Sequence, residues 1–156
     1  MTTKERIERV ATRQFARYGF DGASIRQIVA EARVTKPVLY YYFKDKRGLY
    51  LGLLEGAVAP LCDEVERIAD GGGPPLGQME KIIAAFLRFF RERPNEFQLL
   101  HQAVERRERE VQIIAQKYFR RIFRGISRAL NEGVDRKVFR SLNVPQTTVT
   151  VIDIIV

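Results

Sequence analysis

Apolar residues recur every three or four positions along most of this sequence, and this spacing restricts the fold to one built from amphipathic helices. The residues that share one face of the first predicted helix are Ile7, Val10, Ala11, Phe15 and Tyr18. The ambiguous segment is residues 147–156, whose β-branched residues suit a strand or an eighth helix equally. The pattern therefore predicts an all-α protein.

Capping residues predict where the first helices begin and end. Thr2 with Glu5, and Ser24 with Gln27, have the spacing of capping boxes, in which a hydroxyl and a longer polar side chain bond reciprocally to the backbone. Gly19 is placed to end the first helix, because glycine adopts the left-handed conformation that follows many helices. We therefore expect a long first helix followed by a short second one.

Later helices are predicted in the same way. We expect a short aromatic helix over about 35–42 and a fourth helix over about 45–69, which Pro60 should bend by removing one backbone bond. The glycine- and proline-rich stretch at 70–75 is a loop. A long helix over about 107–131 is expected to stop at Gly133.

The net charge of +8 is unevenly distributed. Residues 1–50 carry eleven Lys and Arg against five Asp and Glu, or +6, whereas residues 51–156 carry sixteen against fourteen, or +2. This asymmetry favours a polyanion-binding N-terminal lobe, although a merely solubilising surface is the alternative. The basic residues at its centre are Arg26, Arg33, Lys36, Lys44, Lys46 and Arg47.

Residue counts argue against several classes of protein. One cysteine and one histidine leave no disulfide framework and no expected metal site. Motifs for a nucleophilic serine, a phosphate-binding glycine loop or a zinc protease do not occur, so we expect no catalytic residues, no cofactor and no enzyme activity. No apolar run has membrane-spanning length and the first residues lack a signal-peptide core, which predicts a cytoplasmic protein without membrane contact.

Two short helices that follow a longer one have helix-turn-helix spacing. The segment IVAEARVTKPVLYYYFKDKRGL, residues 28–49, resembles the DNA-binding signature of TetR (tetracycline-repressor-like) regulators, and the similarity covers residues 7–53. It implies a three-helix DNA-binding domain over residues 1–46 and a C-terminal helical effector-binding and dimerisation domain over residues 47–156.

The predicted recognition helix carries groups suited to DNA. Thr35 and the free backbone N–H groups behind it can hold a phosphate, and Lys36 can reach a guanine edge or a phosphate. Pro37 and Val38 offer apolar contact to a thymine methyl. The resemblance adds four further DNA-binding residues, namely Arg26, Tyr40, Tyr42 and Lys46. Since three consecutive tyrosines cannot share one helix face, we expect at least one of residues 40–42 to pack inward, and we leave Tyr41 out of the site.

Arg33 departs from the resemblance, because the family usually has glycine there. The position is a turn that favours positive φ, where a residue other than glycine costs on the order of 1 kcal/mol. The substitution also adds a cation near the expected DNA surface.

The resemblance further implies a small-molecule pocket in the larger domain, and its phenylalanines suit an apolar or aromatic ligand. The candidate ligand-binding residues are Leu61, Cys62, Phe86, Phe90, His101, Tyr118 and Ile122. Each could equally belong to an ordinary helical core, and Cys62 has the alternative of a redox-active thiol. A basic stripe that could hold an anionic effector, or simply face solvent, consists of Lys117, Arg121, Arg124 and Arg128.

Together these features predict a homodimeric repressor that binds a palindromic double-stranded DNA operator and is released by a small effector. The alternative is a DNA-binding adaptor of the same fold that answers to a protein partner and has no pocket. The sequence stops within an apolar run at Val156, so we expect this run to pack on a partner or to continue beyond it, as in a C-terminally truncated chain.

Overall fold

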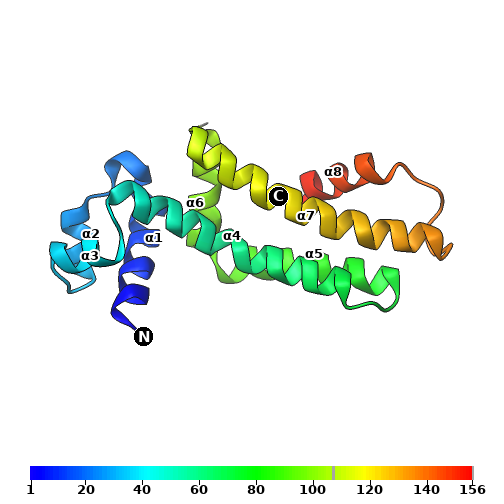
Figure 1. The fold of residues 1–156 in the computed structure, drawn as a ribbon, viewed down its shortest axis with the longest axis horizontal. Helices are drawn as coiled ribbons and strands as arrows, with labels where there is room; N and C mark the ends of the chain where they lie inside the picture. The colour runs from blue at the N-terminus through cyan, green and yellow to red at the C-terminus, as the bar shows by residue number, and fades with distance from the viewer. Residues whose placement is uncertain (107, 156) are drawn as a thin grey trace. The chain divides into compact units, whose positions relative to one another are not determined.

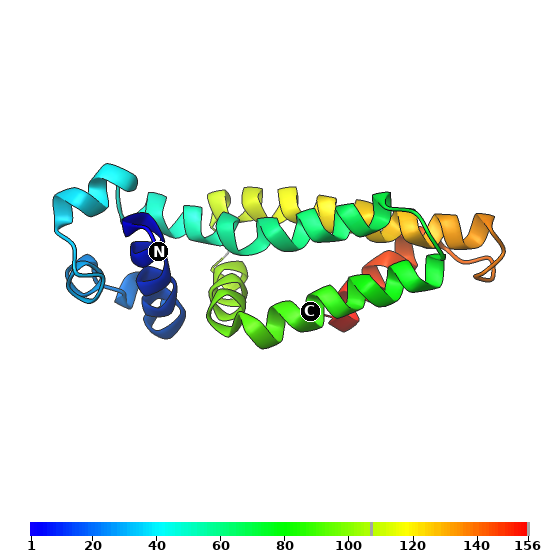
Figure 2. The same cartoon turned by 90° about the horizontal axis from the view of Figure 1, so that it is seen from below.

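A computed structural model describes residues 1–106 and 108–155, and within them the fold is all-α, with helices joined by turns and loops and no strand, as predicted. The chain forms two compact units, Met1–Ala57 with Arg93–Ile114, and Val58–Glu92 with Ala115–Val156. The helices can be followed by colour in Figures 1 and 2. In chain order they are α1 (Thr3–Gly22), α2 (Ile25–Glu31), α3 (Lys36–Tyr42), α4 (Lys46–Asp70), α5 (Pro75–Glu92), α6 (Pro94–Glu105), α7 (Arg109–Asp135) and α8 (Val144–Ile155).

The first unit packs α1, α2 and α3 with the start of α4 and with α6, which returns from later in the chain to lie against α1. The Gln102 side chain donates to the Ala16 carbonyl at 2.9 Å across this contact. The Phe15 ring is fully buried and meets the Tyr50 ring edge-on, with centroids 5.2 Å apart. This compact unit therefore extends beyond residues 1–46, and a functional boundary at residue 46 stays a prediction.

The capping box predicted at the start of α1 is confirmed, but the one predicted at the start of α2 is wrong. The Thr2 hydroxyl accepts from the Glu5 backbone N–H, and the Glu5 carboxylate accepts from the Thr2 N–H. Gly19 interrupts the helix at φ +69° before a last turn to Gly22. Ser24 precedes α2 in extended backbone but makes no side-chain cap bond, so the predicted capping box with Gln27 does not form.

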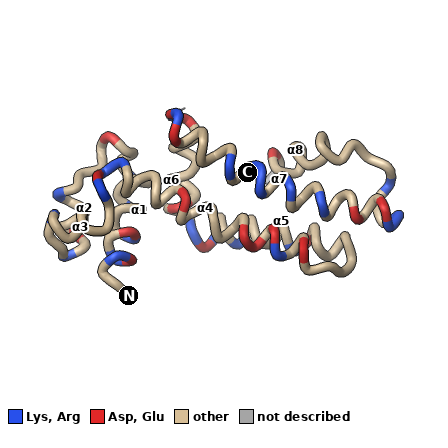
Figure 3. The backbone as a smooth tube through the Cα atoms, in the orientation of Figure 1, with Lys and Arg blue, Asp and Glu red and all other residues tan. Residues whose placement is uncertain are grey.

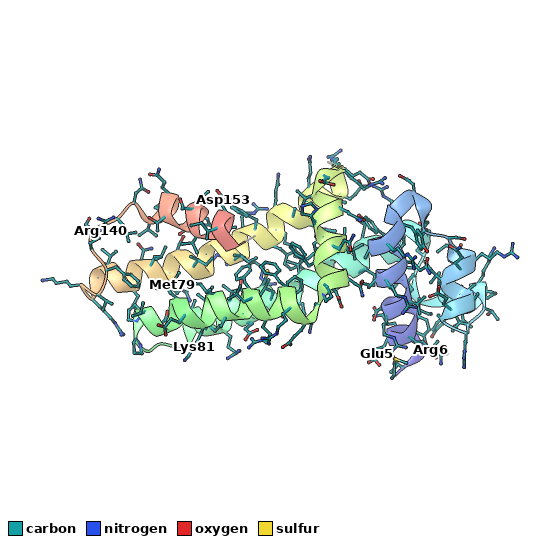
Figure 4. All side chains as sticks on the ribbon, turned by 180° about the vertical axis from the view of Figure 1, so that it is seen from behind. Glu5, Arg6, Met79, Lys81, Arg140 and Asp153 are labelled. Atoms are coloured by element: carbon teal, nitrogen blue, oxygen red, sulfur yellow. The ribbon has the colours of Figure 1, made fainter. Side chains whose placement is uncertain are left out.

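The second unit holds α5, α8 and the later parts of α4 and α7. Helices α4 and α7 approach closely at Gly125, where an added Cβ would lie 2.7 Å from Val65 Cγ1. In Figure 4, Met79 lies on the inner side of α5 and Lys81 on its exposed side. A buried stripe of α5 thus faces the core of this unit, as amphipathic spacing requires.

The basic stripe on α7 serves partly to join helices. Arg121 donates to the carboxylates of Glu66, at 2.5 and 3.0 Å, and of Asp63 at 2.5 Å. Arg128 pairs with Asp70, also on α4. Both signs of charge occur along α7 in Figure 3. Two of the four basic residues are therefore committed to structure and not to a free cationic face.

The end of α7 differs from the prediction. The helix continues through Gly133 to Asp135, and the left-handed residue that follows it is Lys137, at φ +59°. Gly133 has a different role, since a Cβ on it would lie 2.1 Å from the Phe139 ring. The glycine therefore admits the aromatic side chain that follows the helix.

The ambiguous C-terminal segment is helical through Ile155. Thr148 is fully buried, and its hydroxyl donates to the Val144 carbonyl at 2.8 Å and lies 2.9 Å from Ser127 Oγ. These bonds satisfy the buried hydroxyl within a helix, which a strand would not do with the same partners. Among the described residues, no helix is long and apolar enough to cross a membrane.

Candidate nucleic-acid interface

Helix α3 presents almost all of its side chains outward. Only Leu39 and the following Phe43, one helical turn apart, are buried, and they join the core of the first unit. Lys36, Pro37 and Val38 are exposed at the first turn, where a recognition helix would enter the major groove. Because only Leu39 and Phe43 hold α3 to the core, its other side chains remain accessible to a ligand.

The three consecutive tyrosines are all exposed, so the prediction that at least one packs inward is wrong. Their exposed fractions are 44% for Tyr40, 84% for Tyr41 and 40% for Tyr42. The Tyr41 ring packs edge-on against Tyr42, with centroids 5.1 Å apart. Because α3 uses only Leu39 and Phe43 for its core, it has room for three exposed rings, and Tyr41 belongs to the same surface.

The polar residues predicted around α3 are also accessible. Thr35 lies in extended backbone at the N-terminal end of α3, and its exposed side chain makes no cap bond there. Arg26 is exposed on α2, and Lys44 is exposed just after α3. These groups supply donors and cations next to an aromatic surface, which is the combination that phosphates and base edges require.

Lys46, at the start of α4, is held in place by the end of α1. Its ammonium nitrogen lies 4.8 Å from the centroid of the Phe20 ring and 3.4 Å from the Asp21 carbonyl oxygen. The neighbouring Asp45 carboxylate accepts from the Gly48 backbone N–H at 2.6 Å and so caps α4. The two Lys46 contacts direct the lysine side chain towards the end of α1.

A cluster of ion pairs connects the start of α4 with the ends of α1 and α6, and sequence reasoning missed it. Arg106, at the end of α6, donates to Asp21 at 2.8 Å and to Glu108 at 2.7 Å. Arg47 donates to Glu108 at 2.9 Å and to Glu110 at 2.8 Å. Hydrogen bonding to Arg106 holds the pKa of Asp21 below its ordinary value of 3.8. Arg47 is thus neutralised locally, unlike the free cation that the charge count implied.

The turn between α2 and α3 confirms the prediction for Arg33, whose φ is +52°. The Arg33 N–H donates to the Ala30 carbonyl at 3.1 Å, and the Val34 N–H donates to the Val29 carbonyl at 3.0 Å. This pair of bonds is the Schellman arrangement, which places the residue after the helix cap in the left-handed region. An arginine occupies a position that glycine fills most easily.

Arg33 also lines a surface groove of about 410 Å³ between α1 and α2. The groove is lined by Arg13, Gln14, Arg17, Tyr18, Ala30, Glu31 and Arg33. Glu31 is bonded on its two oxygens by Arg13 and Gln14, each at 2.6 Å. The sequence offered a weak signal for this site, since Arg13 and Arg17 lie one turn apart on the polar side of α1.

The residues predicted to bind a small molecule fall mainly in the second unit. Four of them have packed side chains, with exposed fractions of 7% for Leu61, 0% for Cys62, 2% for Phe86 and 6% for Tyr118. Phe90 and Ile122 are half-buried. His101 lies in the first unit instead, on the exposed side of α6, with its ring 6.2 Å from that of Phe97. A hollow of about 380 Å³ near the α7–α8 loop, lined in part by Arg140, contains none of these seven residues.

Cys62 has the character of a core residue. Its sulfur lies 3.7 Å from the Tyr118 carbonyl oxygen, and burial raises the pKa of the thiol to about 12. A reactive cysteine needs an accessible thiolate, which requires a lowered pKa. The alternative of a redox-active thiol is therefore not supported.

Comparison with known proteins places the helix-turn-helix in a family. Residues 7–53 match the family described as "Bacterial regulatory proteins, tetR family". The HTH-type transcriptional repressor SCO4008 of Streptomyces coelicolor is 41% identical over 63 residues, which are 40% of this chain and 33% of that protein. The aligned part spans about a third of the length of the first curated relatives it matches.

Solved structures share the fold over nearly the whole chain. The regulator PfmR from Thermus thermophilus superimposes with a TM-score of 0.86 at 21% identity, covering 99% of this chain and 83% of that one. FadR from Bacillus subtilis, solved in complex with stearoyl-CoA, gives a TM-score of 0.79 at 17% identity, covering 97% and 82%. At these identities the similarity establishes the fold alone.

Proposed function

We propose that this chain, whose residues 7–53 match the TetR family of bacterial regulatory proteins, represses transcription by binding a palindromic DNA operator. The observation that carries the proposal is the exposed face of α3. Lys36, Pro37, Val38 and the tyrosines of residues 40–42 remain accessible on a helix anchored only by Leu39 and Phe43. Arg26 and Lys46 flank that helix in sequence as cations suited to phosphate contacts.

DNA binding is tested by selecting duplexes from a random library and comparing the selected sequence with a scrambled one by fluorescence anisotropy. We expect a Kd of about 10⁻⁸ M or below for the selected site at physiological salt, and an affinity at least about a thousandfold weaker for the scrambled duplex. Equal affinities for the two duplexes would contradict a sequence-specific regulator.

We further propose a small apolar or aromatic effector that binds in the second unit. The interior there is apolar and aromatic, with Phe86 and Phe90 on α5 and Tyr118 and Ile122 on α7. The solved complex of FadR with stearoyl-CoA supports this proposal by analogy, because that protein has the same fold and holds an apolar chain. Leu61 and Cys62 on α4 complete the proposed ligand-binding set of this unit, whereas His101 lies on α6 in the first unit and stays a separate prediction.

The regulatory step follows from the position of Lys46 at the first turn of α4. In a homodimer, two recognition helices must enter major grooves about 34 Å apart, so a displacement of α4 by a ligand would change their spacing. Pro60, within α4, is the proposed pivot. If Pro60→Ala leaves both operator affinity and effector response unchanged, the proline has no part in release. The homodimer is tested separately, by measuring the molar mass of the protein in solution with equilibrium sedimentation.

A second function is favoured by one observation, the tight packing of Leu61, Cys62, Phe86 and Tyr118. A DNA-binding adaptor that answers to a protein partner needs no cavity among these side chains. A thermal-shift screen of fatty acids, acyl-CoAs and aromatic compounds separates the two, because a ligand at one hundred times its Kd stabilises its protein by about 2.7 kcal/mol. Stabilisation supports the effector, whereas DNA binding without any stabilising compound supports the adaptor.

A further inference from the structure

Three arginines converge on the groove between α1 and α2, outside the surface of α3 described above. Arg13 and Arg17 come from α1, and Arg33 comes from the turn that precedes α3. Glu31 also lines the groove, so its charged residues sum to three positive and one negative, or +2. A groove with this net positive charge attracts anions electrostatically.

The three arginines differ in their availability. Arg13 is engaged with Glu31 at 2.6 Å. Arg17 and Arg33 make no ion pair within residues 1–106 and 108–155, and the Arg17 guanidinium carbon instead lies 5.2 Å from the centroid of the Tyr18 ring. The Glu31 carboxylate in the lining is already bonded by Arg13 and Gln14, so the net positive charge of the groove is carried by Arg17 and Arg33.

The backbone at Arg33 points to a ligand in its own right. A side chain other than glycine is disfavoured at φ +52°, and such strained residues cluster where the strain serves binding or catalysis. Nothing in the turn requires an arginine, because both Schellman bonds use backbone atoms only. The Arg33 side chain instead lines the groove.

The position of the groove identifies the anion. Arg33 precedes Thr35, the extended residue just before the recognition helix, by two positions, so their Cα atoms lie at most about 7 Å apart. This is the end of α3 that enters the major groove, and phosphates line both edges of that groove. A phosphate of the same duplex is thus the anion within nearest reach of these cations.

We propose that Arg33 and Arg17 bind a phosphate of the DNA backbone and extend the interface from α3 onto α1. The proposal rests on the DNA binding proposed above and adds a contact that a glycine at position 33 could not make. The contact is independent of base sequence, since it involves only the phosphodiester. It therefore strengthens binding to every duplex by a similar factor.

The test replaces the arginine with the residue that the turn favours. Arg33→Gly should raise the melting temperature by about 2–4 °C, because the strain of positive φ is relieved. The same variant should bind a 20-base-pair duplex of random sequence about five- to tenfold more weakly at 0.15 M salt, and the slope of log K against log salt should become shallower by about 0.9. Gain of stability with loss of DNA affinity excludes a purely structural role.

Two further variants serve as controls. Arg33→Lys keeps both the charge and the strain, and should retain the wild-type salt slope and melting temperature. Arg140→Ala removes one positive charge from the exposed α7–α8 loop, visible in Figure 4, and should leave both quantities unchanged. Arg17→Ala should reproduce the shallower slope of Arg33→Gly without its higher melting temperature.

The outcomes distinguish this proposal from the one on which it rests. If wild-type protein discriminates a selected duplex from a scrambled one while Arg33→Gly keeps the wild-type slope and affinity, the regulator stands and the phosphate contact is overturned. In that case any anion bound in the groove would be a ligand other than DNA. If wild-type protein binds no duplex, both proposals are overturned together.

Discussion

The Arg106 guanidinium donates to the Asp21 carboxylate at 2.8 Å, across 85 positions of sequence. Its central carbon also lies 5.3 Å from the centroid of the Phe20 ring, the same ring that Lys46 approaches to 4.8 Å. The end of α6 and the start of α4 therefore share one anchoring point at the end of α1. This arrangement links the predicted phosphate-binding lysine to a residue far outside the helix-turn-helix.

Removal of this link should be visible in the titration of Asp21. The Arg106 hydrogen bond lowers the pKa of that carboxyl below 3.8, so the ion pair stabilises the fold above the ordinary pKa and is lost as pH falls through the lowered value. In Arg106→Ala, we expect the pKa of Asp21 to return towards 3.8, as measured by NMR of the carboxyl carbon. An unchanged pKa would show that Arg106 is not paired with Asp21 in solution.

Two lysines should differ in their effects on DNA binding. Lys46→Ala removes a proposed phosphate contact and should weaken all duplexes alike, with a salt slope shallower by about 0.9. Lys36→Ala should also reduce discrimination between a selected site and its variants, by about 1–3 kcal/mol at the contacted base pair. Anisotropy titrations on matched and mismatched duplexes measure both. Loss of base preference in Lys46→Ala would reverse the assignment of the two roles.

Because Phe139 lies so close to Gly133, we predict that even an alanine at position 133 lowers the free energy of unfolding. Gly133→Ala would place a methyl group 2.1 Å from the ring, and overpacking of this kind costs about 1–3 kcal/mol. Gly56→Ala in α4 is the matched control, because nothing lies within 4 Å of its added Cβ and alanine favours a helix by about 1 kcal/mol. Urea unfolding should show opposite signs for the two changes. Stabilisation by both would mean that Phe139 does not pack on α7.

The buried thiol predicts an alkaline loss of stability. Burial raises the pKa of Cys62 from its ordinary 9.0 to about 12, so the protonated thiol stabilises the fold below pH 9 and that contribution is lost as pH rises from 9 to 12. Cys62→Ala should abolish this part of the alkaline decline, as followed by thermal unfolding at several pH values. A native thiol that reacts with an aromatic disulfide reagent at pH 7 as fast as unfolded protein does would contradict its burial.

Much of the helix-turn-helix could be predicted because its signals are local. The Thr2–Glu5 capping box, the break at Gly19 and the positive φ at Arg33 each depend on residues within one turn. Two predictions about helix ends were wrong. Ser24 makes no cap bond, and α7 continues past Gly133, whose missing Cβ leaves room for the Phe139 ring.

The sequence by itself determined the helical periods and the excess of positive charge in the first 50 residues. Only the tertiary structure decided which cations are free. Arg47 is paired with Glu108 and Glu110, more than 60 positions away, whereas Arg33, which lines the same groove as Arg17, has no carboxylate partner among the described residues. Helix formation depends on neighbours along the chain, but the partner of a charge depends on which distant helix packs beside it.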